Sequence, residues 1–254
     1  MVPRPAYLGC AGWSLPRDAH AAFAADGSHL QRYASRLNAA EINSSFHRPH
    51  SRATYERWAA SVPQTFRFSV KLPRTITHDL RLVAVDALLD DFLTQASGLG
   101  DRLGCLLVQL PPGLEFQPTV AAGFFDALRS RYPGPVALEP RHASWFTAEV
   151  DRFLSQRAVA RVLADPVRHD AGRLPGGWSG RVYLRLHGSP RMYYSSYEPA
   201  TLQALARRIM QALREDREVW CIFDNTAGNA AALNAVDLQI ALEAHARPPG
   251  NGGQ

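Results

Sequence analysis

The sequence predicts an α/β protein, a single (β/α)8 barrel of the TIM type whose sixth helix is short or missing. Three observations lead to this fold: eight β-like runs, helical segments between most of them, and a length of 254 residues. The runs are apolar almost throughout, which is typical of a parallel sheet covered on both faces. Their starts lie 23 to 37 residues apart, about one strand and one helix each.

The eight runs are rich in β-branched and other apolar residues and are bounded by turn-forming residues. They cover residues 6–9, 39–42, 66–71, 103–110, 135–139, 158–164, 181–187 and 217–223. An open, doubly wound sheet is the competing fold, and it usually shows a glycine-rich first turn. The first turn here, GCAGWS, matches G-x-G-x-x-G poorly, which favours the barrel.

Six segments have helical periodicity: residues 29–37, 51–62, 85–99, 118–132, 199–215 and 228–246. Ser51 is a candidate N-cap, and Pro118 and Pro199 stand in the first turn, where proline is favoured. Residues 165–180 are rich in turn-forming residues and show no helical pattern, so we expect the sixth helix to be missing.

We expect residues 1–246 to form one TIM-like barrel domain and residues 247–254, RPPGNGGQ, to form a disordered tail. The longest apolar run, residues 103–110, is too short for a bilayer, which needs about 20 residues. The first ten residues lack the apolar stretch of a signal peptide. Three cysteines without paired spacing argue against a disulfide framework or a zinc site. The expectation is a cytoplasmic protein with no membrane partner.

The formal net charge of +5 is carried by arginine, because Lys71 is the only lysine in the chain. An arginine surplus can attract anions or nucleic acid, although it more often makes only a basic, solvated surface. Charge alone therefore leaves the partner open.

Polar residues gather where the predicted strands end, and in a barrel the loops at that end build the site. The candidate catalytic residues are Glu41, Lys71, Glu139, Asp165 and His187. The candidate substrate-binding residues are Trp13, Asn43, His78, Gln109, Arg141, Arg185, Tyr194, Asp224, Asn225 and Gly228. We expect these side chains to share one hollow at the barrel mouth.

Local patterns support individual members of this set. Glu139 and Arg141 share strand parity, so both should lean toward the barrel axis. His187 stands at a strand tip beside a glycine, which favours a functional histidine. The competing interpretation is a set of buried structural ion pairs, but burying so many charges is expensive, which favours function for the set as a whole.

The loops after the seventh and eighth strands, HGSPRMYYSSY and DNTAGNAA, occupy the usual phosphate site of this fold. Thr226 and Gly228 precede a helix whose free N–H groups could hold an anion, and helix capping alone is the competing explanation. Rim aromatic residues such as Trp13 and Tyr194 either stack on a sugar or base or simply pack the rim.

Several motifs together resemble the domain-of-unknown-function 72 family, the YecE-like proteins. They are GCAGWS, EINSSFHR, FRFSVKLPRTITH, LLVQLPP, LEPRHASWF, VYLRLHG, YYSSY and FDNTAGNAAALNA. The resemblance runs in order from about residue 7 to residue 243 and implies a TIM-like barrel, but it supplies no activity. The family motifs fall on Trp13, Glu41, Asn43, Phe46, Lys71, His78, Gln109, Pro111, Glu139, Arg141, Trp145, Asp165, Arg185, His187, Gly188, Tyr194 and Asn225.

Two positions depart from the family pattern that the resemblance implies. The family usually has tyrosine where this chain has His47, and commonly a second asparagine where this chain has Asp224. A function that needs a phenol at the first position, or an uncharged amide at the second, is therefore in doubt here.

The first functional hypothesis is an enzyme using acid–base chemistry on a small polar, anionic substrate that contains phosphate or sugar. His187 or Glu139 would be the general base, and Lys71 the acid or an electrostatic stabiliser. Arg141 and Arg185 would hold the anion. A Schiff base at Lys71 and a phosphate held by the same amine both remain open. The reaction class, whether hydrolase, lyase or isomerase, is not indicated.

Two other hypotheses compete with it. A hydrolase or isomerase could hold a divalent metal, the one cofactor considered, on Glu41, Glu139, Asp165, Asp224 and His187. The neighbouring cations and the lack of a second strand-end histidine weigh against that metal. A non-catalytic protein could instead bind nucleic acid or a sugar nucleotide through its arginines and rim aromatics. The oligomeric state is not indicated.

Overall fold

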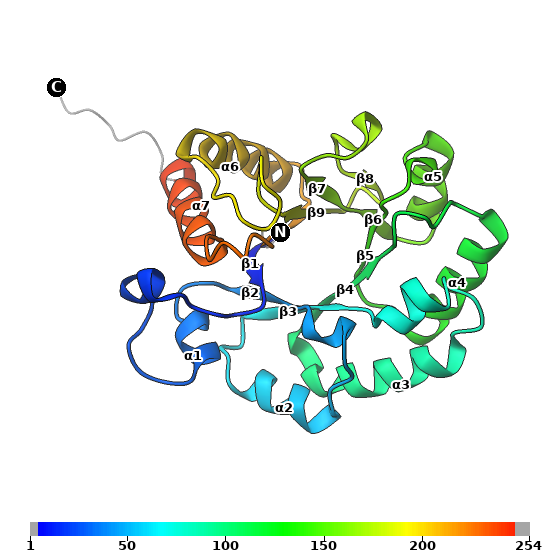
Figure 1. Cartoon of the computed structure of the whole chain (residues 1–254), viewed down its shortest axis with the longest axis horizontal. Helices are drawn as coiled ribbons and strands as arrows, with labels where there is room; N and C mark the ends of the chain where they lie inside the picture. The colour runs from blue at the N-terminus through cyan, green and yellow to red at the C-terminus, as the bar shows by residue number, and fades with distance from the viewer. Residues whose placement is uncertain (1–4, 247–254) are drawn as a thin grey trace.

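The computed structural model describes residues 5–246 and contains one sheet of ten strands (Figure 1). The strands are β1 Ala6–Ala11, β2 Ala39–Ile42, β3 Arg67–Lys71, β4 Leu103–Gln109, β5 Val136–Glu139, β6 Val159–Arg161, β7 Leu163–Asp165, β8 Gly176–Gly177, β9 Arg181–Leu186 and β10 Glu218–Phe223. Their order in the sheet is β7-β9-β10-β1-β2-β3-β4-β5-β6-β8. Neighbouring strands are parallel, except that β8 runs antiparallel to β6.

The sheet is nearly closed, and its break lies within the sixth predicted strand. The N–H of Val162 still donates to the Leu138 carbonyl of β5 at 2.8 Å, whereas Leu163 pairs with Leu184 of β9. The chain thus changes partner within one residue, which splits the predicted strand 158–164 into β6 and β7. The α/β class and a barrel-like sheet are confirmed. Ten strands, one of them antiparallel, replace the eight that we predicted.

Seven α-helices lie within the described residues, outside the ring of strands (Figure 1). They are α1 His29–Ala34, α2 Arg52–Ala60, α3 Asp86–Ala96, α4 Pro118–Arg131, α5 Ala148–Gln156, α6 Pro199–Arg214 and α7 Ala231–Ala246. The Ser51 hydroxyl caps α2 as predicted, accepting from the Thr54 N–H at 3.3 Å. The sequence interpretation missed α5, which Thr147 caps in the same way.

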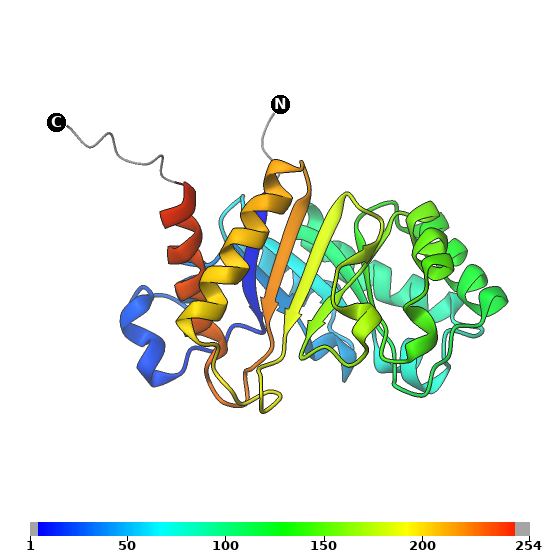
Figure 2. The ribbon, with the colours of Figure 1, turned by 90° about the horizontal axis from the view of Figure 1, so that it is seen from above.

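As predicted, the described chain forms no α-helix between β7 and β9. A single 3-10 turn, Asp170–Gly172, and the short strand β8 occupy that interval. Figure 2 shows β9 and β10 side by side with α6 and α7 next to them, and the arrowheads of both strands point to one edge of the sheet. The loops that follow the strands lie at this edge.

Alternation along the strands separates two apolar clusters. Leu106 and Val108 of β4 face the helices and belong to the larger cluster, which includes the apolar faces of α3, α4 and α6. Cys105 and Leu107 point the other way, into the space that the sheet encloses. The members of this inner cluster are Ala39, Cys105, Leu107, Ala137, Val162, Tyr183, Trp220 and Ile222. The interior is therefore filled by packed side chains below the strand ends.

Two further expectations concern the ends of the chain and membranes. The predicted disordered tail, residues 247–254, lies outside the described residues. Between residues 5 and 246, the longest and most apolar helices fall short of what a bilayer crossing requires. Cys10, Cys105 and Cys221 are buried free thiols.

Candidate active site

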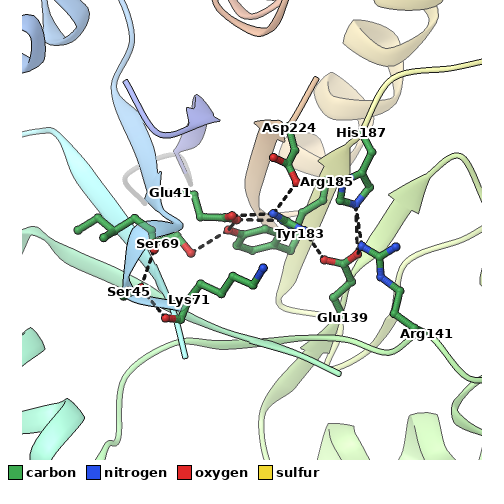
Figure 3. Close-up of polar contacts among 11 residues, drawn as sticks. Glu41, Ser45, Ser69, Lys71, Glu139, Arg141, Tyr183, Arg185, His187 and Asp224 are labelled. Carbon is green, nitrogen blue, oxygen red and sulfur yellow. Dashed lines mark hydrogen bonds and ion pairs between the residues drawn. The ribbon is translucent and has the colours of Figure 1, made fainter. Parts of the chain in front are cut away.

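Five strands bring charged side chains together at the carboxyl end of the sheet (Figure 3). We call this set the charge cluster; its members are Glu41, Lys71, Glu139, Arg141, Arg185, His187 and Asp224. Each of them is at most 7% exposed. The expectation that acids, arginines, the lysine and the strand-tip histidine converge is thus met for these seven residues.

Arg185 is the centre of the charge cluster. Its Nε and Nη2 donate to the two oxygens of Glu41 at 3.0 and 2.7 Å, and its Nη1 donates to Glu139 at 2.6 Å. Nη2 also donates to Asp224 Oδ2 at 2.9 Å. Burial opposes the charge of Arg185, but the three carboxylates outweigh it and hold its pKa well above the usual value. Arg185, one of the two arginines predicted to hold the substrate anion, therefore uses its hydrogen-bond donors for the protein's own carboxylates.

His187 lies between two carboxylates and an arginine. Its Nδ1 is 3.0 Å from Asp224 Oδ2, while its Nε2 is 3.1 Å from Glu139 Oε1 and 3.2 Å from Nη2 of Arg141. Burial lowers the pKa of His187, but the hydrogen bonds to Asp224 and Glu139 outweigh burial and raise it. A protonated ring donates to both carboxylates, and a neutral ring donates to Asp224 and accepts from Arg141. The ring has partners in either protonation state.

Glu139 and Asp224 remain ionised in this environment. Burial raises the pKa of Glu139, but the charges of Arg185 and Arg141 outweigh it and hold the pKa well below its usual range. Arg141 also forms a direct ion pair with Glu139. Burial raises the pKa of Asp224 as well, and Arg185 and His187 reverse that effect and lower it. Both carboxylates can therefore accept hydrogen bonds from His187.

Lys71 ends β3 with its amine directed into the charge cluster (Figure 3). The Nζ atom lies over the Phe46 ring, 4.0 Å from its centroid. Within residues 5–246, Lys71 forms no ion pair, unlike the other charged members. Burial and the positive charge of Arg185 lower the pKa of Lys71 to about 8, against the opposite effect of the three carboxylates.

Tyr183 and Ser69 extend the charge cluster toward the interior, and the sequence interpretation missed both. The Tyr183 hydroxyl is 2.8 Å from Ser69 Oγ and 3.2 Å from Glu41 Oε2, and both residues are fully buried. A signal for them was present, because each stands two positions before a cluster residue on the same strand, Arg185 or Lys71. Strand parity therefore places them on the same inward face.

Asp165 does not join the charge cluster, contrary to its expected place among the catalytic residues. Ala164 is the register partner of Arg185, so it shares the inward face and Asp165 points outward. The carboxylate of Asp165 accepts from the Tyr197 hydroxyl at 2.6 Å. It lines a separate surface hollow of about 470 Å³ with Ser189.

Three further candidate binding residues, His78, Gln109 and Asn43, lie in or after the strands β2, β3 and β4. The His78 ring meets Phe46 edge-on at 4.9 Å between centroids, and burial and the charge of Lys71 lower its pKa. Gln109 is the register partner of Glu139 and shares its inward face. The Oδ1 atom of Asn43 is buried and has no hydrogen-bond partner among the described residues.

The aromatic candidates divide between core packing and the rim. Trp13 packs edge-on against Trp58 and Phe68, 5.1 and 6.1 Å away between ring centroids, so it supports the core rather than a ligand. Tyr194 is 48% exposed and stacks on Arg191. Its neighbour Tyr193 instead meets His187 edge-on at 5.6 Å, which makes Tyr193 the tyrosine that covers the charge cluster.

Asn225 and Gly228 join the two loops that follow β9 and β10. Asn225 Nδ2 donates to the Ser195 carbonyl at 3.0 Å and to Asn234 Oδ1 at 2.9 Å. The N–H of Gly228 donates to the Tyr193 carbonyl at 3.0 Å. The Gly228 amide itself is therefore not available to an anion, because this loop contact already uses it.

Gly228→Ala is expected to lower the free energy of unfolding by about 1–3 kcal/mol, the usual range for overpacking. A Cβ at this position would lie 2.1 Å from the Tyr194 carbonyl oxygen, so the two loops would have to separate. The matched control is Gly123→Ala in α4, where a Cβ meets nothing within 4 Å and should stabilise by about 1 kcal/mol. Urea unfolding measures both, and equal changes would contradict the role of Gly228.

The described residues do not bring together the ligands of the competing metal hypothesis. No three His, Cys, Asp or Glu side chains between residues 5 and 246 are arranged to hold a metal ion. Asp165 points away from the other expected ligands, and Glu41, Glu139 and Asp224 direct oxygens at Arg185 instead.

The fold and the charge cluster define an α/β protein with a barrel-like sheet and a polar site at the carboxyl ends of its strands. Residues 7–252 match the family described as "Protein of unknown function DUF72". The chain belongs to the DUF72 family, which confirms the resemblance seen in its motifs.

Relatives and solved structures agree with this assignment. The chain is 31% identical to UPF0759 protein YecE of Escherichia coli K12 over 166 residues, 63% of this chain but only 58% of that protein. It is 22% identical to UPF0759 protein YunF of Bacillus subtilis 168, over 93% of this chain and 94% of that protein.

Two crystal structures of DUF72 proteins share the fold. The Enterococcus faecalis V583 protein has a TM-score of 0.78 at 21% identity, over 94% of this chain and 96% of that one. The Thermotoga maritima MSB8 protein has a TM-score of 0.76 at 24% identity, over 94% and 99%.

Proposed function

We propose that this protein is an enzyme that performs acid–base chemistry on a small anionic substrate at the carboxyl ends of its strands. The observation that carries the proposal is the position of His187, which has hydrogen-bond partners for both of its protonation states. A general acid or base must hold and release a proton without losing its place, and this arrangement permits that. We also interpret the nearly closed sheet as a (β/α)8 barrel opened at Val162, a fold whose enzymes keep their sites at this end.

The other cluster residues have supporting roles in this proposal. Asp224 fixes the ring orientation of His187 through Nδ1, and Glu139 accepts a hydrogen bond from Nε2 when the ring is protonated. Arg185 holds both carboxylates in place and keeps them ionised. Positioning of this kind lets a buried group change its charge without rearrangement of its neighbours.

Arg141 is the residue that we assign to the anionic group of the substrate. Its Nη2 contacts Glu139 and His187, but its buried Nε has no hydrogen-bond partner among the described residues. A buried donor without an acceptor is unfavourable by about 1–3 kcal/mol, so a carboxylate or phosphate oxygen there would remove that penalty. Arginine matches the planar geometry of such anions.

Neither competing hypothesis gains support over this one. Of the predicted rim aromatics, Trp13 is used in packing, so a stacking surface for nucleic acid would rest mainly on Tyr193 and Tyr194. A metal would have to compete with Arg185 for the same carboxylates.

A thermal-shift screen tests the proposal. The library contains sugar phosphates, carboxylic and oxo acids, nucleotides and oligonucleotides, and each compound that binds is then assayed for turnover. A small anion at 100 times its Kd should stabilise the protein by about 2.7 kcal/mol. Arg141→Met should abolish that shift, whereas Arg173→Met, at an exposed arginine paired with Asp170, should preserve it.

Two results of the screen would contradict the proposal. One is binding of oligonucleotides alone with a steep loss at high salt, which indicates a nucleic-acid protein. The other is binding of small anions that are never converted, which indicates a binder without catalysis.

A further inference from the structure

We propose that the amine of Lys71 is a nucleophile that forms a Schiff base with the carbonyl carbon of a substrate whose carboxylate or phosphate group is held by Arg141. This inference rests on the proposed function and names the substrate class for the same site: oxo acids and the phosphates of aldehydes or ketones.

The first argument is the position of Lys71, whose amine is buried and lies over the Phe46 ring rather than in an ion pair with a carboxylate among the described residues. Its amine points into a group of three carboxylates (Figure 3), yet it forms no ion pair within residues 5–246, since Arg185 holds all three. A lysine kept for stability would offset its desolvation by pairing with one of them. Lys71 is 6% exposed and is the only lysine of the chain. A buried amine without a counter-ion is available for chemistry.

The second argument is that the base of the Lys71 side chain is held rigidly. Its carbonyl oxygen accepts from the Ser45 hydroxyl at 2.6 Å, and the following residue donates from Leu72 N–H to the Leu107 carbonyl at 2.9 Å. The Phe46 ring covers the amine on one side at 4.0 Å. A nucleophile on a strand end keeps its direction of attack, which is a large part of catalysis by positioning.

The third argument is the charge state of the amine. Only the neutral amine attacks a carbonyl carbon. With its pKa lowered to about 8 by burial and by Arg185, about one tenth of Lys71 is neutral at pH 7. An ordinary lysine is neutral in only about one molecule in three thousand at that pH. The surroundings of Lys71 thus raise the fraction of neutral, reactive amine above that of an ordinary lysine.

The reaction balances with groups that the charge cluster contains. The neutral amine of Lys71 forms a bond to the carbonyl carbon, and protonated His187 gives its proton to the carbonyl oxygen, which becomes a hydroxyl. The attacking nitrogen then gives one of its protons to the neutral His187 ring. His187 passes this proton to the hydroxyl, which leaves as water, and the carbon–nitrogen double bond forms with one hydrogen still on the nitrogen. The protonated imine then draws electrons from the adjacent carbon, so that a hydrogen there can pass as a proton to the neutral His187 ring.

Reductive trapping tests the proposal. The protein is incubated with pyruvate, with glyceraldehyde 3-phosphate or with the neutral ketone acetone, and is reduced with sodium cyanoborohydride. Peptide mass mapping then separates Lys71 from the amino terminus, the other primary amine. We expect both anionic compounds to label Lys71, and pyruvate to label it at least about tenfold more than acetone because of the charge-assisted contact with Arg141.

Two variants make the result specific. Lys71→Arg keeps the positive charge, removes the nucleophile and should lose the label entirely. Arg141→Met should lower the ratio of pyruvate labelling to acetone labelling about tenfold. Arg173→Met, at an exposed arginine paired with Asp170, should leave that ratio unchanged. The urea-unfolded chain sets the background for an ordinary lysine.

The outcomes separate this proposal from the proposed function. If neither anionic compound labels Lys71 above the background of the unfolded chain, the Schiff-base proposal is overturned. If turnover persists in Lys71→Arg, the Schiff-base proposal is also overturned, but the proposed acid–base catalysis is not. If Lys71 is labelled but the methyl protons of pyruvate do not exchange with D2O and no compound in the screen is converted, the Schiff base stands and acid–base catalysis falls.

Discussion

Arg185→Met is expected to lower the free energy of unfolding by about 3–5 kcal/mol, the cost of breaking a buried ion pair from one side. Three carboxylates, those of Glu41, Glu139 and Asp224, would lose their shared counter-charge inside the protein. Methionine has a similar volume, so the loss reports charge rather than a cavity. Urea unfolding followed by circular dichroism measures the change.

Arg181→Met is the matched control for this prediction. Arg181 lies on the same strand with the same parity and is 5% exposed, but it pairs with a single carboxylate, Glu218, at 2.6 Å. We expect a clearly smaller loss there. If Arg185→Met does not fold, the double variant Glu41→Gln with Arg185→Met should recover folded protein, because one of the uncompensated charges is gone. Equal losses for the two arginine variants would contradict the central role of Arg185.

His187→Gln is expected to lower kcat by about 100- to 10,000-fold for any substrate that the screen identifies. Glutamine can still hydrogen-bond to Asp224 and Glu139, but its amide does not exchange protons at neutral pH. KM should change little, because Arg141 still holds the anion. His142→Gln is the control: this histidine lies in the loop after β5 and contacts Ser144, so its loss should leave kcat near the wild-type value. A His187 variant that retains full kcat would remove the histidine from the mechanism.

The pH profile supplies a second readout for His187. Burial opposes its charge, but the hydrogen bonds to Asp224 and Glu139 prevail, so its pKa lies above the ordinary 6.5. Where the protonated ring is required, the rate should fall as pH rises through that raised pKa. His187→Gln should remove this limb of the profile, and Asp224→Asn should move it to lower pH because one stabilising negative charge is lost. A limb that is unchanged in both variants would belong to another group.

The positions of the charged side chains at the strand ends could be predicted from local sequence patterns. Parity along a single strand placed Glu139 and Arg141 on one face, and the structure joins them in an ion pair. The same reasoning placed Lys71 and His187 at strand tips, where both are found. These predictions succeeded because alternation and the common direction of parallel strands depend only on neighbouring residues.

Asp165 and Gly228 show where local patterns fail. Asp165 directly follows a predicted strand, as Asp224 does, yet the change of partner at Val162 sets its orientation, and it faces outward. The contact of the Gly228 amide was not predicted, because its acceptor, the Tyr193 carbonyl, belongs to a different loop. Neither contact leaves a trace in the residues next to it.

The sequence alone determined the α/β class, the main strands, the absence of a sixth helix and the set of charged side chains at one edge of the sheet. Only the tertiary structure decided which of these cations forms ion pairs with which carboxylates. It assigned Arg185, 144 residues from Glu41, to the three carboxylates. Among the described residues, this leaves Lys71 without an ion pair and the Nε of Arg141 without an acceptor. The physical reason is that hydrogen bonding and charge compensation depend on distances of a few ångströms between distant segments, which periodicity along the chain does not encode.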